Sequence, residues 1–269
     1  MNLKNRVAVI TGAGGGIGRA TALSLARRGC HLALADIDEA GLAGTHAQAL
    51  EFGVRASQHP LDVADRAAVG ALPAEVLKSH DGVNLLVNNA GVALGGHFDQ
   101  VSEADFDWLM EINFHAVVRM TRAFLPLLRA GDDARIVNIS SVFGLISPPG
   151  QSAYSASKFA VRGFSNALRH ELSGTRVGVS VVHPGGVATA IARNARVSAG
   201  ASAEEKSRRL ALAEKLLRLP PTMAAEIIVR GIEKRRARIL VGRDAIFIAL
   251  VERLFPVNYW RVLGRGIQS

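Results

Sequence analysis

Short runs of β-branched and other apolar residues alternate along the chain with longer stretches whose apolar residues repeat near the helical period. Strand followed by helix, repeated, is typical of a doubly wound α/β fold, in which helices cover both faces of a parallel sheet. The expected strands are Arg6–Thr11, His31–Asp36, Val54–His59, Val83–Asn88, Arg135–Ser140, Arg176–His183 and Arg238–Val241. The expected helical segments include Ile17–Arg28, Asp38–Phe52, Ala64–His80 and Ser102–Ala130. The last segment opens with Ser102-Glu103-Ala104-Asp105, a carboxylate variant of the helix capping box.

The composition supports a single domain built around an aliphatic core. Of the 269 residues, 49% are hydrophobic but 5% are aromatic, so the core must consist mainly of alanine, valine, leucine and isoleucine. Such a core favours a helix-covered parallel sheet and excludes a disordered chain. The sequence has no internal repeat and no linker rich in proline, glycine or serine, so we expect residues 1–269 to form one domain.

Cysteine content and hydropathy favour a cytoplasmic protein. The single cysteine, Cys30, cannot form an intramolecular disulfide and has no metal-ligand spacing around it, so we expect a reducing compartment and no metal site. Residues Met1–Arg6 lack the basic-then-apolar order of a signal peptide, and no uncharged apolar run approaches a length of about 18 residues.

The net charge of +9 is confined to the last third of the chain. Residues 1–189 carry 16 basic and 16 acidic side chains, whereas residues 190–269 carry 16 basic and 7 acidic ones. An anionic partner or surface is therefore expected to meet the last third. The sequence has no nucleic-acid recognition motif, so we predict no nucleic-acid partner.

A glycine-rich turn follows the first expected strand and leads into a helix, with the sequence Thr11-Gly12-Ala13-Gly14-Gly15-Gly16-Ile17-Gly18. Glycines let the backbone turn sharply and let a pyrophosphate approach the amides at the helix N-terminus. Glycines that serve packing alone would give a similar turn. The residues expected to contact a dinucleotide here are Gly12, Gly14, Gly16, Ile17 and Gly18.

Two acidic residues at later strand ends favour NAD as the cofactor. Asp36 ends the second strand, 18 residues after Gly18, where a carboxylate can accept both ribose hydroxyls and repel a 2′-phosphate. A helix N-cap is the alternative role, which Asp38 could equally serve, and Arg19 or Arg6 could neutralise a phosphate. Asp62 and Val63, after the third strand, are placed near the adenine, with N-capping as the alternative for Asp62.

Further motifs give the chain a family resemblance. Asn88-Asn89-Ala90-Gly91 ends the fourth strand, and Tyr154-Ser155-Ala156-Ser157-Lys158 opens a later helix. Together with the glycine turn, a helical Asn113, the pair Ser140-Ser141 and Pro184-Gly185, this order resembles the short-chain dehydrogenase/reductase family over about residues 5–190. The resemblance implies a Rossmann fold, a nicotinamide cofactor and a homodimer or homotetramer.

Tyr154 and Lys158 make chemical sense together without the family. They are four residues apart, so they share one helix face, and a nearby ammonium stabilises a phenolate and lowers its pKa. A surface tyrosine and a solvated lysine would show the same spacing. Ser141, 13 residues before Tyr154, opposes that alternative because it follows a predicted strand at the sheet edge where ligands bind.

The resemblance assigns a role to each of these residues. Ser141 would bond the substrate oxygen, and Tyr154 would exchange its proton. Lys158 would lower the tyrosine pKa and hold the nicotinamide ribose, so Tyr154 and Lys158 both lie against the cofactor. Asn113 would hold a water on the proton path, although a mid-helix asparagine often bonds its own backbone.

The resemblance also implies further cofactor contacts. Those from the fourth strand end are Asn89, Ala90 and Gly91, and those after the sixth strand are Pro184, Gly185, Val187 and Thr189. The Val187 backbone and the Thr189 hydroxyl would bond the carboxamide. His183, directly before Pro184, is interpreted as structural.

The segments after residue 187 are expected to select the substrate. Residues 187–220 resemble the family's substrate lid and contain an amphipathic helix, Ala203–Leu219, which would equally suit packing on the core. The small, polar stretch Ser198–Ala203 is expected to be a mobile loop. The apolar neighbours expected around the catalytic serine, which favour a hydrophobic substrate, are Val142, Phe143, Leu145, Ile146, Ala93 and Leu94.

Residues 244–269 form a basic, apolar C-terminal extension with Tyr259-Trp260. A subunit interface is the preferred interpretation, and an anionic membrane surface or an acidic acyl carrier are the alternatives.

We therefore expect an NAD-dependent oxidoreductase that interconverts a hydrophobic secondary alcohol and its ketone, with Tyr154 as acid and base. An NADPH-dependent reductase of 3-oxoacyl thioesters and a membrane-surface scaffold that senses NAD are the alternatives.

Overall fold

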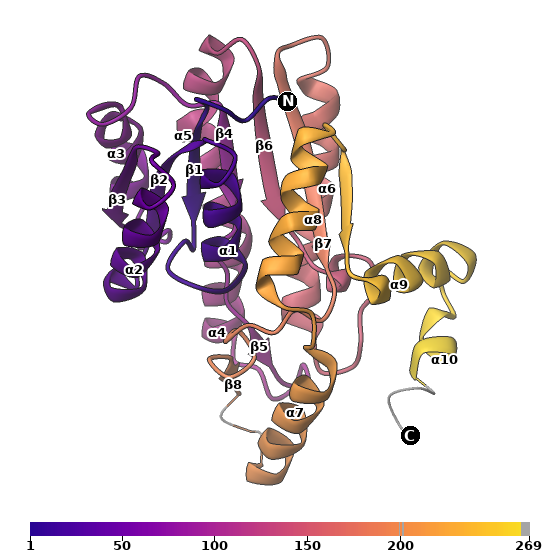
Figure 1. Ribbon diagram of the computed structural model, residues 1–269. Coiled ribbons are helices and arrows are strands. Elements are labelled where there is room, and N and C mark those ends of the chain that lie inside the picture. Colours follow the sequence, from indigo (N-terminus) through magenta and orange to yellow (C-terminus); the bar gives the residue numbers. More distant parts are fainter. Residues whose placement is uncertain (199, 201, 265–269) are drawn as a thin grey trace.

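Seven parallel strands form one sheet in the order β3-β2-β1-β4-β6-β7-β9 (Figure 1). The computed structural model describes residues 1–198, 200 and 202–264. The strands are β1 (Val7–Thr11), β2 (His31–Asp36), β3 (Ala56–Pro60), β4 (Leu85–Asn88), β6 (Ala134–Ile139), β7 (Val177–Pro184) and β9 (Arg238–Val241). All seven expected strands are present, so the predicted doubly wound fold is confirmed.

Six helices cover the two faces of this sheet, and each of them presents an apolar side to it. The helices are α1 (Gly16–Ala26), α2 (Glu39–Leu50), α3 (Arg66–Leu77), α4 (Glu103–Met110), α5 (Ala116–Ala130), α6 (Ser152–Glu171), α7 (Ala203–Leu216), α8 (Pro221–Glu233), α9 (Arg243–Leu254) and α10 (Tyr259–Leu263). Helices α1, α2 and α8 contribute to the core on one face, and α3, α5 and α6 to the core on the other. The aliphatic composition thus yields two cores separated by the sheet.

The expected helical segment Ser102–Ala130 is interrupted. Between α4 and α5 lies one π-helical stretch, Glu111–His115, which contains the buried Asn113. At the start of the segment the Ser102 hydroxyl accepts the backbone N–H of Asp105 at 3.1 Å, as a cap should. The Asp105 carboxylate bonds that same hydroxyl at 2.9 Å, so the capping box has one of its two backbone bonds.

A second, two-stranded parallel sheet lies beyond the carboxyl edge of the main one (Figure 1). Its strands are β5 (Leu94–Gly95) and β8 (Arg196–Val197), and the Ser198 backbone N–H continues the ladder to Gly95 at 3.2 Å. The expected mobile loop Ser198–Ala203 is partly outside the described residues, at 199 and 201.

Helix α7 begins in the expected lid with a complete capping box between Ser202 and Glu205. Among its described side chains none is buried, and Leu210 and Leu216 are exposed. The helix therefore does not follow the packed-core alternative. No helix of the described residues is both long and apolar enough to span a bilayer.

Candidate active site

The carboxyl ends of β1 and β4 are bonded to each other where the strand order reverses. In doubly wound sheets, ligands bind outside such a switch point. The hydroxyl of Thr11 accepts the backbone N–H groups of Asn89 and Ala90, each at 3.1 Å. The side-chain amide of Asn89 donates to the carbonyl oxygens of Thr11 and Gly12, each at 3.0 Å. These four bonds fix the position of the glycine turn relative to β4.

The glycine turn fits a dinucleotide. Gly12 and Gly16 have positive φ angles of 66° and 53°, a conformation that side chains disfavour. A Cβ atom on Gly18 would overlap the carbonyl oxygen of Gly12, so the helix can approach the turn only without one. Helix α1 has Gly15 as its N-cap with no side-chain cap, and its first turn carries no acidic residue. Its first backbone N–H groups are thus available to an anion such as pyrophosphate.

Asp36 lies directly against the glycine turn. Its carboxylate accepts the backbone N–H of Gly14 at 2.6 Å and that of Asp38 at 2.9 Å. The N-cap of α2 is Asp38, which accepts the backbone N–H of Gly41 at 3.0 Å. The alternative of Asp36 as an N-cap is therefore wrong, and its charge is free to serve another purpose.

The two arginines considered as phosphate partners have other contacts. Arg19 donates to Thr45 Oγ1 and to the carbonyl oxygen of Gly41, each at 2.9 Å, and also to that of Gly14. Arg6 precedes β1, at the amino end of the strand, and pairs there with Asp132. Arg6 is thus at the opposite edge of the sheet from the glycine turn, so it cannot neutralise a phosphate bound there.

Asp62 does not cap a helix. Its carboxylate accepts the backbone N–H of Ala64 at 2.9 Å, whereas α3 begins at Arg66 with Asp65 as its N-cap. The backbone N–H of Leu61 donates to the carbonyl oxygen of Asp36 at 2.9 Å, which brings this loop beside β2. Val63 is buried in the core.

Ser141, Tyr154 and Lys158 converge beyond the end of β6. The Ser141 hydroxyl accepts the backbone N–H of Phe143 at 3.1 Å and bonds the Tyr154 hydroxyl. Lys158 follows one turn later on α6 and is buried, with its Nζ atom 5.6 Å from the centre of the Tyr154 ring. This Nζ donates to the carbonyl oxygen of Ile139 at 3.3 Å. The strand end thus holds both the serine and the ammonium group.

Burial dominates the charge states of this pair. It raises the pKa of Tyr154 to about 12, although the bond from Ser141 lowers it in part. It also lowers the pKa of Lys158 to about 8. Here Nζ bonds a carbonyl oxygen rather than the phenol, so the expected lowering of the tyrosine pKa by Lys158 stays a prediction.

Asn113 joins the pair through the π-helical stretch. Its Oδ1 accepts the backbone N–H of Val92 at 2.8 Å, and its Nδ2 donates to the Val92 carbonyl at 3.0 Å and to Ser157 Oγ at 3.1 Å. A Cβ atom on Gly91 would lie 3.1 Å from Asn113 Oδ1 and 3.4 Å from Lys158 Nζ. The asparagine therefore bonds a neighbouring segment rather than its own backbone, next to the lysine.

The loop after β7 reaches the glycine turn. The Thr189 Cγ2 atom lies 3.2 Å from the position of a Cβ atom on Gly16. Val187 is buried, and its backbone N–H and carbonyl are bonded to Gly185 and Thr189, at 3.0 and 2.9 Å. A nicotinamide carboxamide bonded by the Val187 backbone would thus use an N–H or a carbonyl group that already has a partner within the loop. Pro184, the last residue of β7, is buried.

Sequence reasoning did not identify Asp244, in the first turn of α9. Its carboxylate accepts the backbone N–H of Gly186 at 2.7 Å, and a Cβ atom on Gly185 would overlap it. The only sequence signal is an acidic residue at a helix start, which is common on any helix.

The expected apolar neighbours of the serine form part of the core. Val142, Leu145, Ile146 and Leu94 are buried. The partly buried Tyr154 packs against a cluster of Leu94, Leu109 and Ala153, and its ring meets Phe143 edge-on at 6.0 Å. The immediate surroundings of the tyrosine are thus apolar.

Comparisons with known proteins agree with this geometry. The model of the short chain dehydrogenase family matches residues 6–199. An oxidoreductase of Mycobacterium tuberculosis named SadH is 45% identical over 272 residues, which cover 99% of this chain and 96% of SadH.

Two solved structures are similar to this one. A short-chain dehydrogenase/reductase from Burkholderia phymatum in complex with NAD superposes with a TM-score of 0.87 at 33% identity, covering 94% of this chain and 95% of that one. An alcohol dehydrogenase from Thermococcus sibiricus complexed with 5-hydroxy-NADP gives 0.75 at 27% identity, covering 88% and 96%. Since the family model spans most of the chain and the structural relatives carry nicotinamide dinucleotides, the chain belongs to the short-chain dehydrogenase/reductase family of NAD(P)-dependent oxidoreductases acting on CH–OH groups.

Proposed function

We propose that the protein interconverts a hydrophobic secondary alcohol and its ketone with NAD as the cofactor. The observation that carries this proposal is the convergence of Ser141, Tyr154 and Lys158 beside the switch point of the sheet. The nicotinamide ring supplies the hydride chemistry when the cofactor is bound. The protein supplies alignment and proton transfer.

The dinucleotide would lie across the carboxyl ends of β1 and β4. Its pyrophosphate would meet the glycine turn at Gly12, Gly14, Gly16, Ile17 and Gly18, and its adenosine would meet Asp36, Asp62 and Val63. The nicotinamide end would lie between the strand end Asn89, Ala90 and Gly91 and the loop Pro184, Gly185, Val187 and Thr189. The bonds that the Thr11 hydroxyl and the Asn89 side-chain amide make to backbone groups, which hold the two strand ends together, support this placement.

The charges around the adenosine end favour NAD over NADP. Asp36 presents its carboxylate beside the glycine turn. Arg19 already donates to three protein oxygens, and Arg6 lies at the other edge of the sheet. A 2′-phosphate would thus meet the negative charge of Asp36, while the guanidinium of Arg19 is directed toward three protein oxygens.

In the oxidation direction, Tyr154 would first pass its own proton toward a water held by Asn113. As the phenolate it would then remove the hydroxyl proton of the alcohol while Ser141 bonds the same oxygen. The tyrosine pKa of about 12 means that Tyr154 is a neutral donor at rest, ready to protonate a ketone oxygen during reduction. Lys158 and Asn113, which meet at Gly91, would connect the tyrosine to the ribose and to a water. The apolar cluster of Leu94, Leu109 and Ala153 supports a hydrophobic substrate.

The chain architecture is proposed as one domain of residues 1–269. Residues 1–190 would bind the cofactor and perform the chemistry, residues 187–220 would cover the substrate, and residues 244–269 would form an extension. The exposed leucines of α7 support its role as a lid. The free and buried thiol of Cys30 supports the expected cytoplasmic setting.

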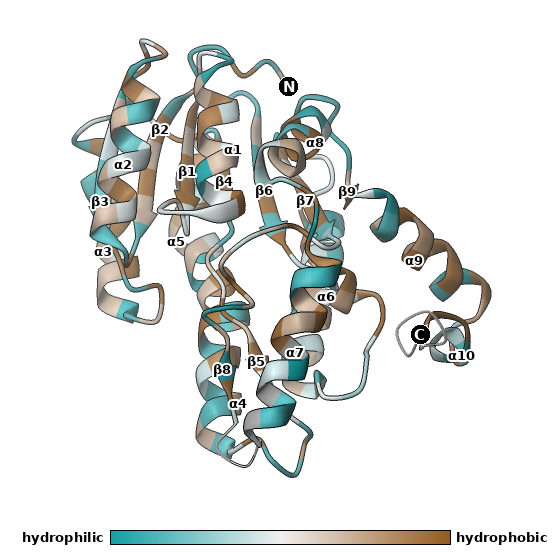
Figure 2. Ribbon diagram, turned by 60° about the horizontal axis from the view of Figure 1, so that its bottom comes forward, coloured by the Kyte–Doolittle hydropathy of each residue, from teal (hydrophilic) through white to brown (hydrophobic). Residues whose placement is uncertain are grey.

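A homo-oligomer assembled through α9 would explain the exposed side chains of that helix. Figure 2 shows α9 projecting from the body of the molecule, with much of its ribbon in the hydrophobic colour. Its exposed apolar residues are Ile246, Phe247, Leu250 and Leu254. Such a face on a projecting helix indicates a protein partner, and a second copy is the commonest one. The Tyr259 hydroxyl accepts the backbone N–H of Ser147 at 3.1 Å and ties α10 to the loop after Ser141.

Replacing Tyr154 with phenylalanine tests the reaction directly. We expect the rate of alcohol oxidation to fall by about 10²–10⁴-fold, because the proton acceptor is lost, with NADH affinity unchanged. The measurement is a screen of hydrophobic secondary alcohols with NADH fluorescence. Tyr259→Phe, at the only other tyrosine, is the matched control and should retain activity. Full turnover by Tyr154→Phe would contradict the proposal.

Replacing Asp36 with alanine tests the cofactor. We expect NADH affinity to fall by about tenfold and NADPH affinity to rise, because the ribose acceptor and the repelling charge are removed together. Fluorescence titration with NADH and with NADPH gives the ratio of the two dissociation constants. Asp65→Ala, at the N-cap of α3, should leave the ratio unchanged. Tighter NADPH than NADH binding by the wild type would favour the 3-oxoacyl thioester reductase.

The buried Lys158 makes stability depend on pH. Its pKa of about 8 lies below the ordinary value of 10.5, so between these values the unfolded chain binds more protons than the folded one. The lysine's contribution to the free energy of unfolding therefore rises with pH in this window. The measurement is the free energy of unfolding in urea for the wild type and for Lys158→Met. We expect the difference between the two values to increase by roughly 2 kcal/mol between about pH 7.5 and 9.5. Lys78→Met, at an exposed lysine, is the control. A difference that does not change with pH for Lys158→Met would show that the ammonium is not desolvated.

Replacing Leu250 with glutamate tests the assembly. We expect the dissociation constant of the oligomer to rise by at least about tenfold, because a charge enters an apolar contact. Light scattering after gel filtration, over a range of protein concentrations, measures it. Leu77→Glu, at another exposed leucine, is the control. If the wild type is monomeric, the second-copy proposal fails, and co-sedimentation with anionic vesicles then tests the membrane alternative.

A further inference from the structure

The peptide group that joins Gly185 to Gly186 is bonded at both of its ends. Its N–H, on Gly186, donates to the Asp244 carboxylate at 2.7 Å. Its carbonyl oxygen, on Gly185, accepts the backbone N–H of Val187 at 3.0 Å. The proposed function places the Val187 backbone against the nicotinamide carboxamide. A carboxylate from α9 thus bonds the same peptide group that bonds this Val187 N–H.

The two neighbouring peptide groups are held by backbone bonds. The N–H of Gly185, in the peptide before, donates to the carbonyl oxygen of Val241 at 2.9 Å. The carbonyl oxygen of Gly186, in the peptide after, accepts the N–H of Leu219 at 2.9 Å. The peptide group between them differs, because its N–H bonds a side chain from another element. Asp244 therefore supplies a contact that the surrounding backbone does not.

A peptide group between two glycines rotates at little steric cost. Rotation of a single peptide plane changes ψ of the residue before it and φ of the residue after it, and glycine lacks the Cβ atom that restricts both angles. Because the N–H and the carbonyl oxygen point to opposite sides of the chain in one plane, a rotation would break the bonds to Asp244 and Val187 together. The bond to Asp244 therefore favours the orientation in which the Val187 N–H is also bonded.

The chain makes room for this carboxylate at two glycines. A Cβ atom on Gly185 or on Gly242 would overlap the Asp244 side chain. Gly242 is the N-cap of α9 and has a φ of 103°, a conformation that favours glycine. Within the described part of the chain, Asp244 forms no ion pair. The first turn of α9 thus directs an exposed carboxylate at the loop after β7.

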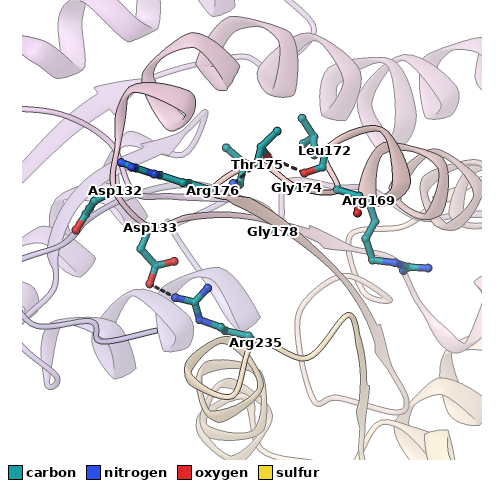
Figure 3. Close-up of a pocket in the computed structure, with 11 residues that line it drawn as sticks. Asp132, Asp133, Arg169, Leu172, Gly174, Thr175, Arg176, Gly178 and Arg235 are labelled. Atoms are coloured by element: carbon teal, nitrogen blue, oxygen red, sulfur yellow. Dashed lines mark hydrogen bonds and ion pairs between the residues drawn. The ribbon is translucent and has the colours of Figure 1, made fainter.

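An acid at the opposite edge of the sheet has a different kind of partner. Asp133, directly before β6, forms an ion pair with Arg235, which precedes β9 (Figure 3). This pair joins two segments at the amino ends of their strands, whereas a ligand of a doubly wound sheet lies at the carboxyl ends. Asp244 follows β9 and Gly186 follows β7, so their bond lies at the carboxyl edge. Of these two acids, Asp244 is the one placed to act on a bound cofactor.

We propose that Asp244 is a positioning residue for the nicotinamide. It holds the peptide between Gly185 and Gly186 in one orientation and thereby sets the Val187 backbone, next to which the carboxamide would bind. Asp244 itself touches neither the cofactor nor the substrate. This role rests on the proposed function, because it takes the nicotinamide end of the dinucleotide to lie at this loop.

The test compares the binding of NADH with that of ADP-ribose, which has the same adenosine, pyrophosphate and second ribose but no nicotinamide ring. We expect Asp244→Ala to raise the dissociation constant of NADH by about tenfold, because the loop is no longer held in one orientation. The dissociation constant of ADP-ribose should stay unchanged, since its contacts lie at the glycine turn and the strand ends. Calorimetric titration measures both constants.

Three further variants separate positioning from a structural role. Asp244→Asn keeps a side-chain oxygen for the Gly186 N–H and should return the dissociation constant of NADH to within about threefold of the wild-type value. Gly185→Ala places a Cβ atom against the carboxylate and should weaken NADH binding as Asp244→Ala does. In the double variant of Gly185 and Asp244 the two losses should not add, because both break the same bond. Glu103→Ala, at an exposed acid in the first turn of α4, is the matched control and should leave both dissociation constants unchanged.

Two results would overturn the proposal. One is equal NADH binding by Asp244→Ala and the wild type, and the other is a loss of the same size for NADH and ADP-ribose. Failure of the proposed function alone gives a different pattern, in which Tyr154→Phe keeps full turnover while Asp244→Ala still weakens NADH binding and spares ADP-ribose. A wild type that binds no NADH overturns both proposals.

Discussion

The bonds between the ends of β1 and β4 determine where everything else in the site can lie. One hydroxyl, that of Thr11, accepts two backbone N–H groups of the β4 end, and one amide, that of Asn89, returns two bonds to the β1 end. The glycine turn is fixed through the same carbonyl, because Gly12 accepts from Asn89 and faces Gly18. These contacts thus fix the position of the N-terminus of α1 relative to β4. A ligand that spans both strands meets a preformed surface.

Desolvation, rather than pairwise attraction, decides the charge states around this surface. The Tyr154 phenol remains neutral although an ammonium group lies near its ring, because both groups are removed from water. The neutral form of His183 has the same cause. Asp36, by contrast, is half-buried, and its carboxylate accepts the backbone N–H groups of Gly14 and Asp38. The groups whose pKa burial shifts thus lie in the interior, and the carboxylate of Asp36 lies nearer the solvent.

The sequence predicts the main sheet well because β1, β2, β4, β6 and β7 are mostly buried runs of largely apolar residues. The edge strand β3, with the sequence Ala-Ser-Gln-His-Pro, has no buried residue. The convergence of Ser141 with Tyr154 was likewise predictable, since a strand end and a helix face are both defined by spacing. Strands β5 and β8 have two residues each, which is too short for an alternation of apolar and polar residues to be recognised in the sequence. The contact of Asp244 with Gly186 joins residues 58 apart, and no local pattern encodes it. The tyrosine pKa depends on how deeply the folded chain buries a group, which residue types alone do not reveal.

The Asp244 carboxylate has a mechanical consequence for the C-terminal extension. It stands in the first turn of α9 and bonds the backbone N–H of Gly186, in the loop that reaches Thr189 and the glycine turn. At the other end of the extension, Tyr259 bonds the loop that follows Ser141. The last helices are therefore attached to the rest of the molecule at these two points. A load on the outer face of α9 would reach the loop beside the glycine turn through Asp244 and the loop after Ser141 through Tyr259.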